Sequence, residues 1–238
     1  MAKKGGNKRQ KRFTASKARQ MNTKSEKWTV KSIPGPFSKE KSIPLGVLLR
    51  DLLGIGRNLR ETKIVLHQGK VSVNGKKRRD YRFPVGLFDI ISIEGFEKDF
   101  MMVFDRKGKL LPKEKSKEEK KSKVCRIEGK KTAKKGKTQL LTNDGRNILV
   151  EKGSEINTND SIEIEVPSQK VLKIFRFEKG AKVFIRGGKH AGQEGIIKEI
   201  IEGSTEQALK PEKLVLVKSG SKEFQTNSKN IFVIGEAK

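Results

Sequence analysis

The feature that most constrains the fold is the stretch 42–94, where the spacing of apolar residues changes from a helical to a strand period. Five leucines lie at i, i+3, i+4, i+7 and i+8, a spacing that places them on one stripe of a helix: Leu45, Leu48, Leu49, Leu52 and Leu53. Gly54 and Gly56 end this predicted helix. Asn58, followed three residues later by Glu61, has the capping-box spacing of a second helix start.

The second helix is expected to end at Gly69, which can adopt the left-handed conformation of a helix cap. We expect it to turn four apolar side chains inward: Leu59, Ile64, Val65 and Leu66. Val71 and Val73 then alternate as a short strand, and Asn74-Gly75 is typical of a type I′ hairpin turn. A second apolar run, 87–93, predicts the next strand. Four consecutive cations follow the turn, and we expect them to face outward because they cannot be buried without partners: Lys76, Lys77, Arg78 and Arg79.

Two short helices packed on a small sheet would hold this basic hairpin rigidly beside Arg57, Arg60 and Lys63. A fixed concentration of positive charge on a compact scaffold suits a phosphate backbone. The alternative is a solvated basic loop without a partner, since runs of charge commonly form solvated faces.

This stretch resembles the small RNA-binding domain named after bacterial ribosomal protein S-four. The resemblance runs from Leu45 to Asp80 as LxxLLRxxLxxxxNLxExKxxLxxGxVxVNGKxRxD. The same domain occurs in pseudouridine synthases, a heat-shock RNA-binding protein and tyrosyl-tRNA synthetases. It therefore implies structured RNA as the ligand without specifying the ribosome.

The charge of the whole chain restricts the class of partner. The chain has 238 residues, enough for two or three small domains. It contains 55 Lys and Arg and 28 Asp and Glu, which gives a net charge of +27. Such an excess of positive charge implies a polyanionic partner. The net charge is +11 in 1–41 and +10 in 105–137, but only +4 in 42–104 and +2 in 138–238. The two basic segments are poor in core-forming residues. We expect them to be RNA-contacting extensions, and we expect the N-terminal arm to order only against RNA.

Several classes of protein are excluded. No apolar run approaches the length of a membrane helix, and the basic N-terminus lacks the apolar segment of a secretory signal. The single cysteine, Cys125, excludes an internal disulfide, fits a reducing compartment and is expected to be inert. Two histidines and one cysteine supply no familiar metal motif. Phosphate-loop, dinucleotide and nucleophile-elbow motifs are absent, and no aspartate has the R-L-D-like setting of a pseudouridine synthase. We therefore expect no catalytic residue, no metal site, no cofactor and no enzyme.

Aromatic residues flank Pro34-Gly35-Pro36 in the basic N-terminal segment. One interpretation is that Trp28 and Phe37 pin this arm to the next domain by apolar burial. The other is that they stack on a base or fill a gap in RNA.

Residues 105–137 are interpreted as a long basic loop, in which 111–124 is either locally helical or a flexible arm. Two apolar runs joined by Asn143-Asp144-Gly145 predict a hairpin, with Arg146 projecting at the turn as a candidate RNA contact. Ile162, Ile164 and Val166 alternate with glutamates, which is typical of a half-buried strand: the strand is expected within 162–166.

A glycine-rich motif, FEKGAKVFIRGGKHAGQEGIIKEI, begins at Phe177. Its glycines permit positive φ and close backbone approach, and the apolar runs 214–218 and 230–235 are expected to close a small barrel. The GxxVxIxxGxxxGxxG order resembles the KOW motif of ribosomal and transcription-elongation proteins. That resemblance implies three contacts to RNA or protein: Arg186, Lys189 and His190. The alternative is a structural barrel with an inert loop.

The order of these parts resembles the ribosomal protein S-four-e family of the archaeal and eukaryotic small subunit, from about Trp28 to Gly235. The matching positions are Pro34-Gly35-Pro36, Ile43-Pro44-Leu45, Asn74-Gly75-Lys76, Pro84-Val85-Gly86, Asp144-Gly145-Arg146-Asn147 and Gly180 to Gly195. The family usually has histidines where this chain has Arg12 or Phe13, Phe37 and Asn143, so contacts from those points stay open.

The resemblance implies an α+β multi-module chain with four parts: a basic N-terminal extension at 1–41, an S-four-type RNA-binding domain of two helices on a sheet at 42–104, a central β-rich domain with a basic loop at 105–175, and a KOW or SH3-like barrel at 176–238. It implies a structural constituent of the small, 30S-type ribosomal subunit, located in the cytoplasm and supporting translation. The implied partners are ribosomal RNA (rRNA) and neighbouring ribosomal proteins, with no membrane and no small-molecule substrate. The alternative function is a non-ribosomal RNA-binding or transcription-elongation factor. The predicted rRNA-binding residues are Lys3, Lys4, Lys8, Arg9, Lys11, Arg12, Trp28, Arg50, Arg57, Arg60, Lys63, Lys70, Lys76, Lys77, Arg78, Arg79, Arg146, Arg186, Lys189 and His190.

Overall fold

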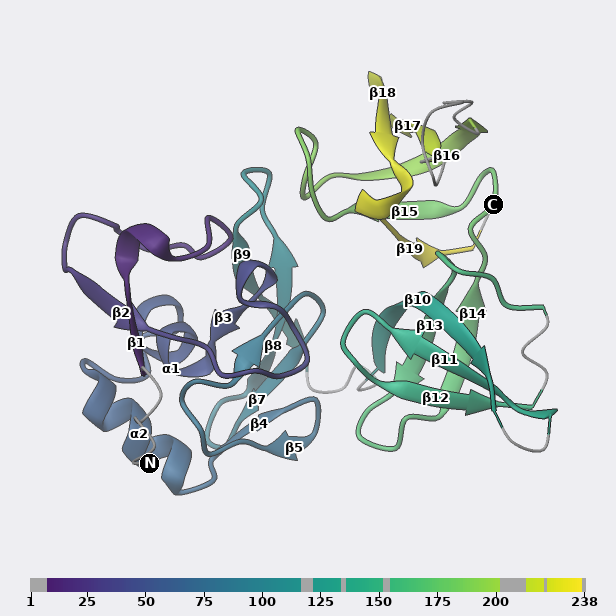
Figure 1. Ribbon diagram of the computed structural model, residues 1–238. Coiled ribbons are helices and arrows are strands. Elements are labelled where there is room, and N and C mark those ends of the chain that lie inside the picture. The colour runs from purple at the N-terminus through teal and green to yellow at the C-terminus, as the bar shows by residue number, and fades with distance from the viewer. Residues whose placement is uncertain are drawn as a thin grey trace, which may run out of the picture. The chain divides into compact units, whose positions relative to one another are not determined.

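The computed structural model describes residues 8–116, 122–133, 136–151, 155–201, 213–220 and 222–236. The chain divides into two compact units (Figure 1). Unit 1 comprises Met1–Val103 and Lys109–Lys121, and unit 2 comprises Phe104–Gly108 and Ser122–Lys238. The described residues are mostly β-strand with few helical segments, and none of the helices among them is long and apolar enough to cross a membrane.

Unit 1 is built on a five-stranded sheet in the order β5-β4-β7-β8-β9. Its strands are β4 (Val71–Val73), β5 (Lys76–Lys77), β7 (Ile90–Ile93), β8 (Lys98–Phe104) and β9 (Leu110–Ser116). Two smaller sheets pair β1 (Arg9–Lys11) with β2 (Trp28–Val30), and β3 (Ile43–Pro44) with β6 (Pro84–Val85). The helical segments are η1 (Arg12–Thr14), η2 (Lys39–Lys41), α1 (Leu45–Val47), η3 (Leu48–Leu52) and α2 (Leu59–His67).

The leucine stripe forms a helix that begins as α1 and widens into the π-helical turn η3. The Leu53 amide donates to the Leu48 carbonyl at 3.0 Å, the i→i+5 bond of a π-turn. Leu45, Leu48 and Leu49 are fully buried, whereas Leu52 and Leu53 are half-buried. The wider turn changes the rotation per residue, so a stripe at ordinary helical spacing does not stay on one face.

The start of α2 is the capping arrangement that the sequence predicts. The Asn58 side chain accepts a hydrogen bond from the Glu61 amide at 2.9 Å, and the Glu61 carboxylate accepts from the Arg57 amide at 2.9 Å. Leu66 is buried, but the prediction that Ile64 faces inward is wrong, because Ile64 is 51% exposed. With 3.6 residues per turn, Ile64 lies on the opposite face from Leu66, and Thr62 fills the buried position instead.

The predicted hairpin turn is confirmed and has an additional anchor. Asn74 and Gly75 both have positive φ, 51° and 73°, as a type I′ turn requires. The Asn74 side chain accepts from the Ile90 amide at 3.0 Å and donates to the Asp89 carboxylate at 2.7 Å. Asp89 in turn accepts from the Gly86 amide at 2.8 Å. This chain of bonds fixes the hairpin to the segment that leads into β7.

The prediction that the N-terminal arm cannot order itself is wrong for the described residues from 8 onward. β1 pairs with β2, and Arg12 is buried with bonds to the Asn22 carbonyl, Ser25 and Glu26 at 2.7–2.9 Å. Arg19 is also buried and donates to the carbonyls of Ser42 and Val30 and to the Ser32 hydroxyl. Burial lowers the pKa of the Arg19 guanidinium to about 10. Because these guanidinium groups act as internal cross-links, the segment folds without an apolar period.

Unit 2 contains two five-stranded sheets, in the orders β12-β11-β10-β13-β14 and β18-β17-β16-β15-β19. The strands of the first are β10 (Ser122–Thr132), β11 (Thr138–Thr142), β12 (Asn147–Val150), β13 (Ser161–Glu165) and β14 (Val171–Phe175). The second contains β15 (Lys182–Ile185), β16 (Glu194–Ile201), β17 (Leu214–Ser219), β18 (Lys222–Asn227) and β19 (Ile231–Gly235), with η5 (Ser228–Asn230) before the last strand.

The interpretation of 105–137 as a long basic loop is wrong in its described part, because β9 and β10 are strands of the two units. Cys125 and Ile127 of β10 alternate inward and are fully buried, and Cys125 lies opposite Ile162 of β13. Residues 117–121 of the predicted helical or flexible arm lie outside the described residues. The hairpin at Asp144 and the half-buried strand at Ile162 are confirmed as β11–β12 and β13.

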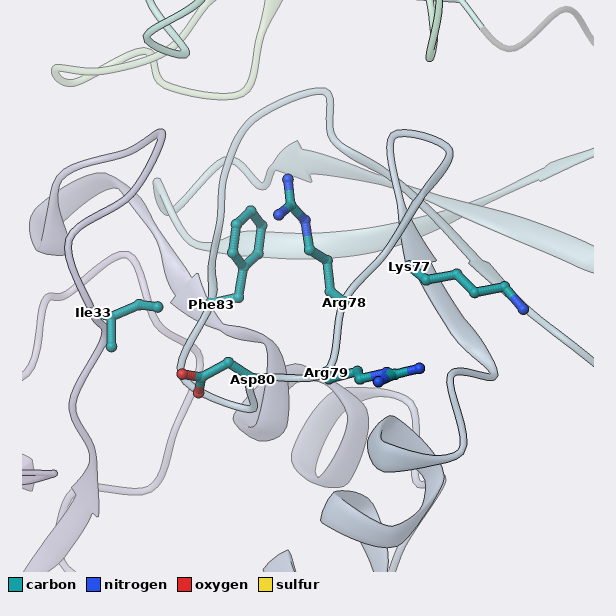
Figure 2. A pocket seen from close by; sticks show the side chains of 6 residues that line it. All are labelled: Ile33, Lys77, Arg78, Arg79, Asp80 and Phe83. Carbon is teal, nitrogen blue, oxygen red and sulfur yellow. The ribbon is translucent and has the colours of Figure 1, made fainter.

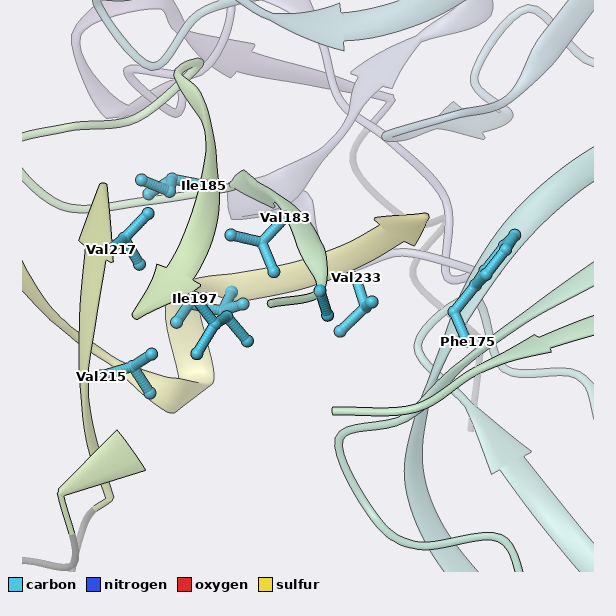
Figure 3. Close-up of a cluster of buried hydrophobic side chains, with 9 residues drawn as sticks. Phe175, Val183, Ile185, Ile197, Val215, Val217 and Val233 are labelled. Carbon is cyan, nitrogen blue, oxygen red and sulfur yellow. The ribbon is translucent and has the colours of Figure 1, made fainter. Parts of the chain in front are cut away.

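The second sheet of unit 2 encloses an apolar core that Figure 3 shows. Val183 and Ile185 of β15 point into it, together with side chains from β16, β17 and β19. Phe175 of β14 belongs to the same cluster, so the two sheets of unit 2 share buried surface. The buried members are Phe175, Ala181, Val183, Ile185, Ile197, Val215, Val217, Ile231 and Val233.

Candidate nucleic-acid interface

The basic hairpin presents most of its cations to solvent. Lys76, Lys77 and Arg79 are exposed. The prediction that all four cations face outward is wrong at Arg78, which is half-buried with its guanidinium carbon 4.3 Å from the centre of the Phe83 ring. A planar and weakly hydrated guanidinium can stack on an aromatic face, which an ammonium does less well.

A hollow of about 480 Å³ lies beside this stacked pair (Figure 2). It is lined by Ile33, Lys77, Arg78, Arg79, Asp80 and Phe83. Asp80 is held in place by Arg82, whose guanidinium donates to both carboxylate oxygens at 3.2 and 3.0 Å. Burial alone would raise the Asp80 pKa, but the hydrogen bonds and charge of Arg82 lower it below its ordinary value.

Cations of α2 lie next to the same segment. The Lys63 ammonium sits 4.4 Å from the centre of the Tyr81 ring. A Cβ built on Gly69, just after α2, would be 3.7 Å from the Lys77 side chain. Arg57 and Arg60 are exposed. The structure therefore brings the predicted cations of the helix and the hairpin onto neighbouring elements of unit 1.

Lys70 and Arg50 are two further predicted contacts in unit 1. Lys70 is exposed and lines a second hollow of about 270 Å³ with Lys77 and Glu94. Lys77 and Glu94 form an exposed ion pair at 3.1 Å. Arg50 lies in the π-turn and is paired with Asp51 at 2.5 Å, so part of its charge is already neutralised.

The N-terminal candidates separate into exposed and internal groups. Lys8, Arg9 and Lys11 are exposed, whereas Arg12 is buried by the bonds described above. Lys3 and Lys4 lie outside the described residues.

The two aromatic residues of the N-terminal segment behave differently. The burial interpretation is confirmed for Phe37, which is 9% exposed and whose ring lies 2.5 Å from the position of a Cβ on Gly86. It is wrong for Trp28, which is 46% exposed with the Lys27 ammonium 5.9 Å from its ring. Trp28 is therefore available to a ligand, and its base-stacking role stays a prediction.

The candidates of unit 2 are more engaged than the sequence suggested. Arg146 does not project freely, because it pairs with Asp144 at 2.9 Å and its side chain is 19% exposed. Arg186 donates to the Lys229 carbonyl at 2.8 Å, and its side chain is 16% exposed. Lys189 is exposed in the glycine-rich loop. His190 stacks on Phe224 with ring centres 3.9 Å apart.

Asp144 is the centre of a buried polar cluster that the sequence did not indicate. It forms an ion pair with Lys123 at 2.7 Å, and both side chains are 1% exposed. It also accepts from the Thr142 hydroxyl at 2.6 Å. Burial alone would raise the Asp144 pKa, but the charge and hydrogen bond of Lys123 lower it to about 2. The neighbouring Cys125 thiol has its pKa raised to about 12, mainly by burial, which agrees with an inert thiol.

Sequence reasoning also missed the aromatic part of the candidate surface. Tyr81 and Phe83 carry three of the cation–ring contacts of unit 1. The available signal was the sequence RRDYRF at 78–83, in which cations and aromatic rings alternate, as in many RNA-binding surfaces. Among the described residues, no group of three or more His, Cys, Asp or Glu is placed to hold a metal ion.

The arrangement defines a class of protein: a basic, β-rich chain that displays cations and stacked aromatic rings on an ordered scaffold, which suits binding to a nucleic-acid backbone. Comparison with known proteins narrows the class. Residues 96–171 match the model described as Ribosomal family S4e. Small ribosomal subunit protein eS4 of Methanosphaera stadtmanae is 40% identical over 238 residues, covering all of this chain and 96% of the relative. The protein of the same name from Sulfurisphaera tokodaii is 38% identical over 95% of this chain and 94% of its own.

A solved structure is similar as well. The crystal structure of the 30S ribosomal protein S4e from Thermoplasma acidophilum matches with a TM-score of 0.69 and 30% sequence identity, covering 83% of this chain and 97% of that one. The similarity thus extends over the full length of this chain in sequence and over 83% of it in fold. The chain belongs to the ribosomal protein S4e family.

Proposed function

We propose that this chain is a structural constituent of the small ribosomal subunit, which binds rRNA beside neighbouring ribosomal proteins and supports translation in the cytoplasm. The observation that carries the proposal is the end-to-end similarity to proteins named small ribosomal subunit protein eS4. The alternative of a non-ribosomal RNA-binding or transcription-elongation factor is not favoured, because these full-length relatives are named as ribosomal.

The proposed mechanism is charge neutralisation on a scaffold of fixed shape. Exposed cations of the hairpin and α2 meet phosphates and release counterions, so the logarithm of affinity falls with the logarithm of salt by about 0.7–0.9 per phosphate neutralised. The contacts are mainly to the RNA backbone. The exposed members of the predicted set carry this role, with Trp28 as a stacking contact: Lys8, Arg9, Lys11, Arg57, Arg60, Lys70, Lys76, Lys77, Arg79 and Lys189.

The four-part organisation is retained as part of the proposal. Residues 42–104 would act as the S-four-type RNA-binding domain, since α2, β4 and the Asn74-Gly75 turn occur in the expected order. Residues 176–238 would act as the KOW or SH3-like barrel, supported by the five antiparallel strands around one apolar core. Residues 105–175 would form the central β-rich domain, and 1–41 the basic extension.

We further propose that the chain is not an enzyme. The support is its membership of a ribosomal protein family, together with the internal roles of its buried polar groups. Asp144, whose pKa is lowered to about 2, is engaged by Lys123, Thr142 and Arg146. A carboxylate that is ionised and bonded on all sides is a structural group rather than a general base.

Binding to purified small-subunit rRNA over a range of salt concentrations tests the proposal. Changing Lys76, Lys77, Arg78 and Arg79 together to Ala should lower the affinity and reduce the salt slope by about 2.1–2.7, because only Lys76, Lys77 and Arg79 of the four are exposed phosphate contacts. A matched control removes four exposed lysines of unit 2 that are outside the proposed surface: Lys170, Lys173, Lys179 and Lys218. An rRNA affinity that is no higher than that for an unrelated RNA, or equal slopes in both variants, would contradict the proposal.

A further inference from the structure

The hollow beside the basic hairpin has the composition of a nucleotide site rather than of a plain phosphate-binding surface. Its volume, about 480 Å³, lies in the range of small-molecule sites, roughly 300–1,000 Å³. A backbone-binding patch needs only cations. This hollow also has two apolar walls, Ile33 and Phe83, and a carboxylate, Asp80.

We propose that this hollow binds one unstacked nucleobase of the bound RNA, which stacks against the Arg78–Phe83 pair and donates an amino hydrogen bond to Asp80. The inference rests on the proposed function, because the nucleotide belongs to the rRNA that the hairpin holds. It adds to that function a site that recognises a base, whereas the exposed cations contact only the RNA backbone.

The stacking wall is already assembled. Phe83 and Arg78 lie side by side with Ile33 across from them (Figure 2), and the guanidinium carbon is 4.3 Å from the ring centre. Extruded bases commonly stack on aromatic rings and on guanidinium planes. The Arg78 Nε is buried and has no hydrogen-bond partner among the described residues, so the contact with the Phe83 ring, rather than a hydrogen bond at Nε, accounts for the position of the guanidinium.

The carboxylate supplies the selectivity. Asp80 Oδ1 already accepts from the Arg82 amide at 2.8 Å and from Arg82 Nε at 3.2 Å, whereas Oδ2 accepts from Nη2 at 3.0 Å and from no other donor in the described part of the chain. An ionised carboxylate is an acceptor only, so Oδ2 has capacity for one more donor. Adenine, cytosine and guanine offer an exocyclic amino group. Uracil offers an N–H flanked by two carbonyl oxygens that the carboxylate repels, so uracil is disfavoured.

The exposed cations at the rim complete the site. Lys77 and Arg79 extend away from Phe83 in Figure 2 and are exposed. They are placed to hold phosphates beside the inserted base, which fixes the register of the strand.

The test uses the full chain and small-subunit rRNA, with two variants that keep the charge of the hairpin. Arg78→Lys removes the planar group, and Phe83→Leu removes the ring but keeps an apolar side chain. Each should weaken binding about fivefold to tenfold and leave the salt slope unchanged, because no phosphate contact is lost. The control Lys76→Ala, an exposed cation that does not line the hollow, should instead reduce the slope by about 0.7–0.9. Trp28 fluorescence in urea checks that unit 1 of each variant is folded.

Base preference is measured with single-stranded heptamers of cytidine and of uridine. The natural chain should prefer the cytidine heptamer by about fivefold, and Asp80→Asn should remove this preference. The inference is overturned if folded Arg78→Lys binds rRNA as tightly as the natural chain, or if the two heptamers bind equally. If the natural chain shows no specific rRNA binding, the proposed function fails and the nucleotide site fails with it. Loss of the base preference alone leaves the proposed function standing.

Discussion

The buried pair of Lys123 and Asp144 predicts a large and local loss of stability when one partner is removed. We consider Asp144→Ala. Both side chains are 1% exposed and 2.7 Å apart, and Thr142 and Arg146 also bond to the same carboxylate. Removing one member of a buried ion pair leaves the other charge without compensation, which typically costs about 3–5 kcal/mol. We expect a loss of this size in the free energy of unfolding of unit 2.

The chain contains a separate probe for each unit, which allows the effect to be assigned. Cys125 is the single cysteine and is fully buried beside Asp144 in unit 2, so its reaction with a thiol reagent in urea reports unfolding there. Trp28 is the single tryptophan and lies in unit 1, so its fluorescence reports the other unit. Asp144→Ala should shift the Cys125 transition to lower urea and leave the Trp28 transition in place.

A double variant separates the ion pair from simple packing. Lys123→Met with Asp144→Leu replaces both charges by apolar side chains of similar size, a change that is often neutral in buried pairs. The double variant should therefore recover most of the stability that Asp144→Ala loses. A loss of less than 1 kcal/mol in Asp144→Ala, or a double variant that is less stable than the single one, would refute the reasoning.

Three further predictions follow from single contacts. Because the folded-state pKa of Asp144 is lowered to about 2, its ion pair stabilises unit 2 above the unfolded pKa of about 4. About 2 kcal/mol should be lost as the pH falls from about 4 to 2, measured by urea unfolding followed by circular dichroism; an equal loss in Asp144→Asn would contradict this. Gly86→Ala places a Cβ 2.5 Å from the Phe37 ring and should lower the free energy of unfolding of unit 1 by about 1–3 kcal/mol, measured by urea unfolding. The control is Gly95→Ala, at a glycine with positive φ and no atom within 4 Å of the added Cβ, which should reveal the cost of backbone strain alone. Asn58→Ala removes the cap of α2 and should cost about 1 kcal/mol; unchanged unfolding of unit 1 would show that Glu61 alone sustains the helix start.

Local signals in the sequence predicted local structure well. Asn74-Gly75 and Asn58 act through their own backbone and their nearest neighbours, so their effect can be predicted without knowing the rest of the fold. The direction of Ile64 could not be predicted as well, because the choice between two faces of a short helix depends on what packs there.

The sequence did not predict the segments whose ordered structure depends on bonds between polar groups far apart in the chain. Arg19 orders the N-terminal segment by bonding to carbonyls up to 23 positions away, and Lys123 is buried in a strand because Asp144 lies 21 positions further on. Both residues belong to runs of positive charge that look solvated in the sequence. The sequence suggested which cations belong to the candidate surface. It did not indicate the stacked Arg78–Phe83 pair, because that contact depends on side-chain geometry, which the spacing of residues in the sequence does not determine.

The most direct test of the account is sedimentation of tagged full-length protein from a cell lysate on a density gradient, at low and at high salt. We expect the protein to migrate with the small subunit in stoichiometric amount and to remain there after the high-salt wash, because many contacts act together. Protein that stays at the top of the gradient, or that modest salt removes completely, would contradict the assignment to the small subunit.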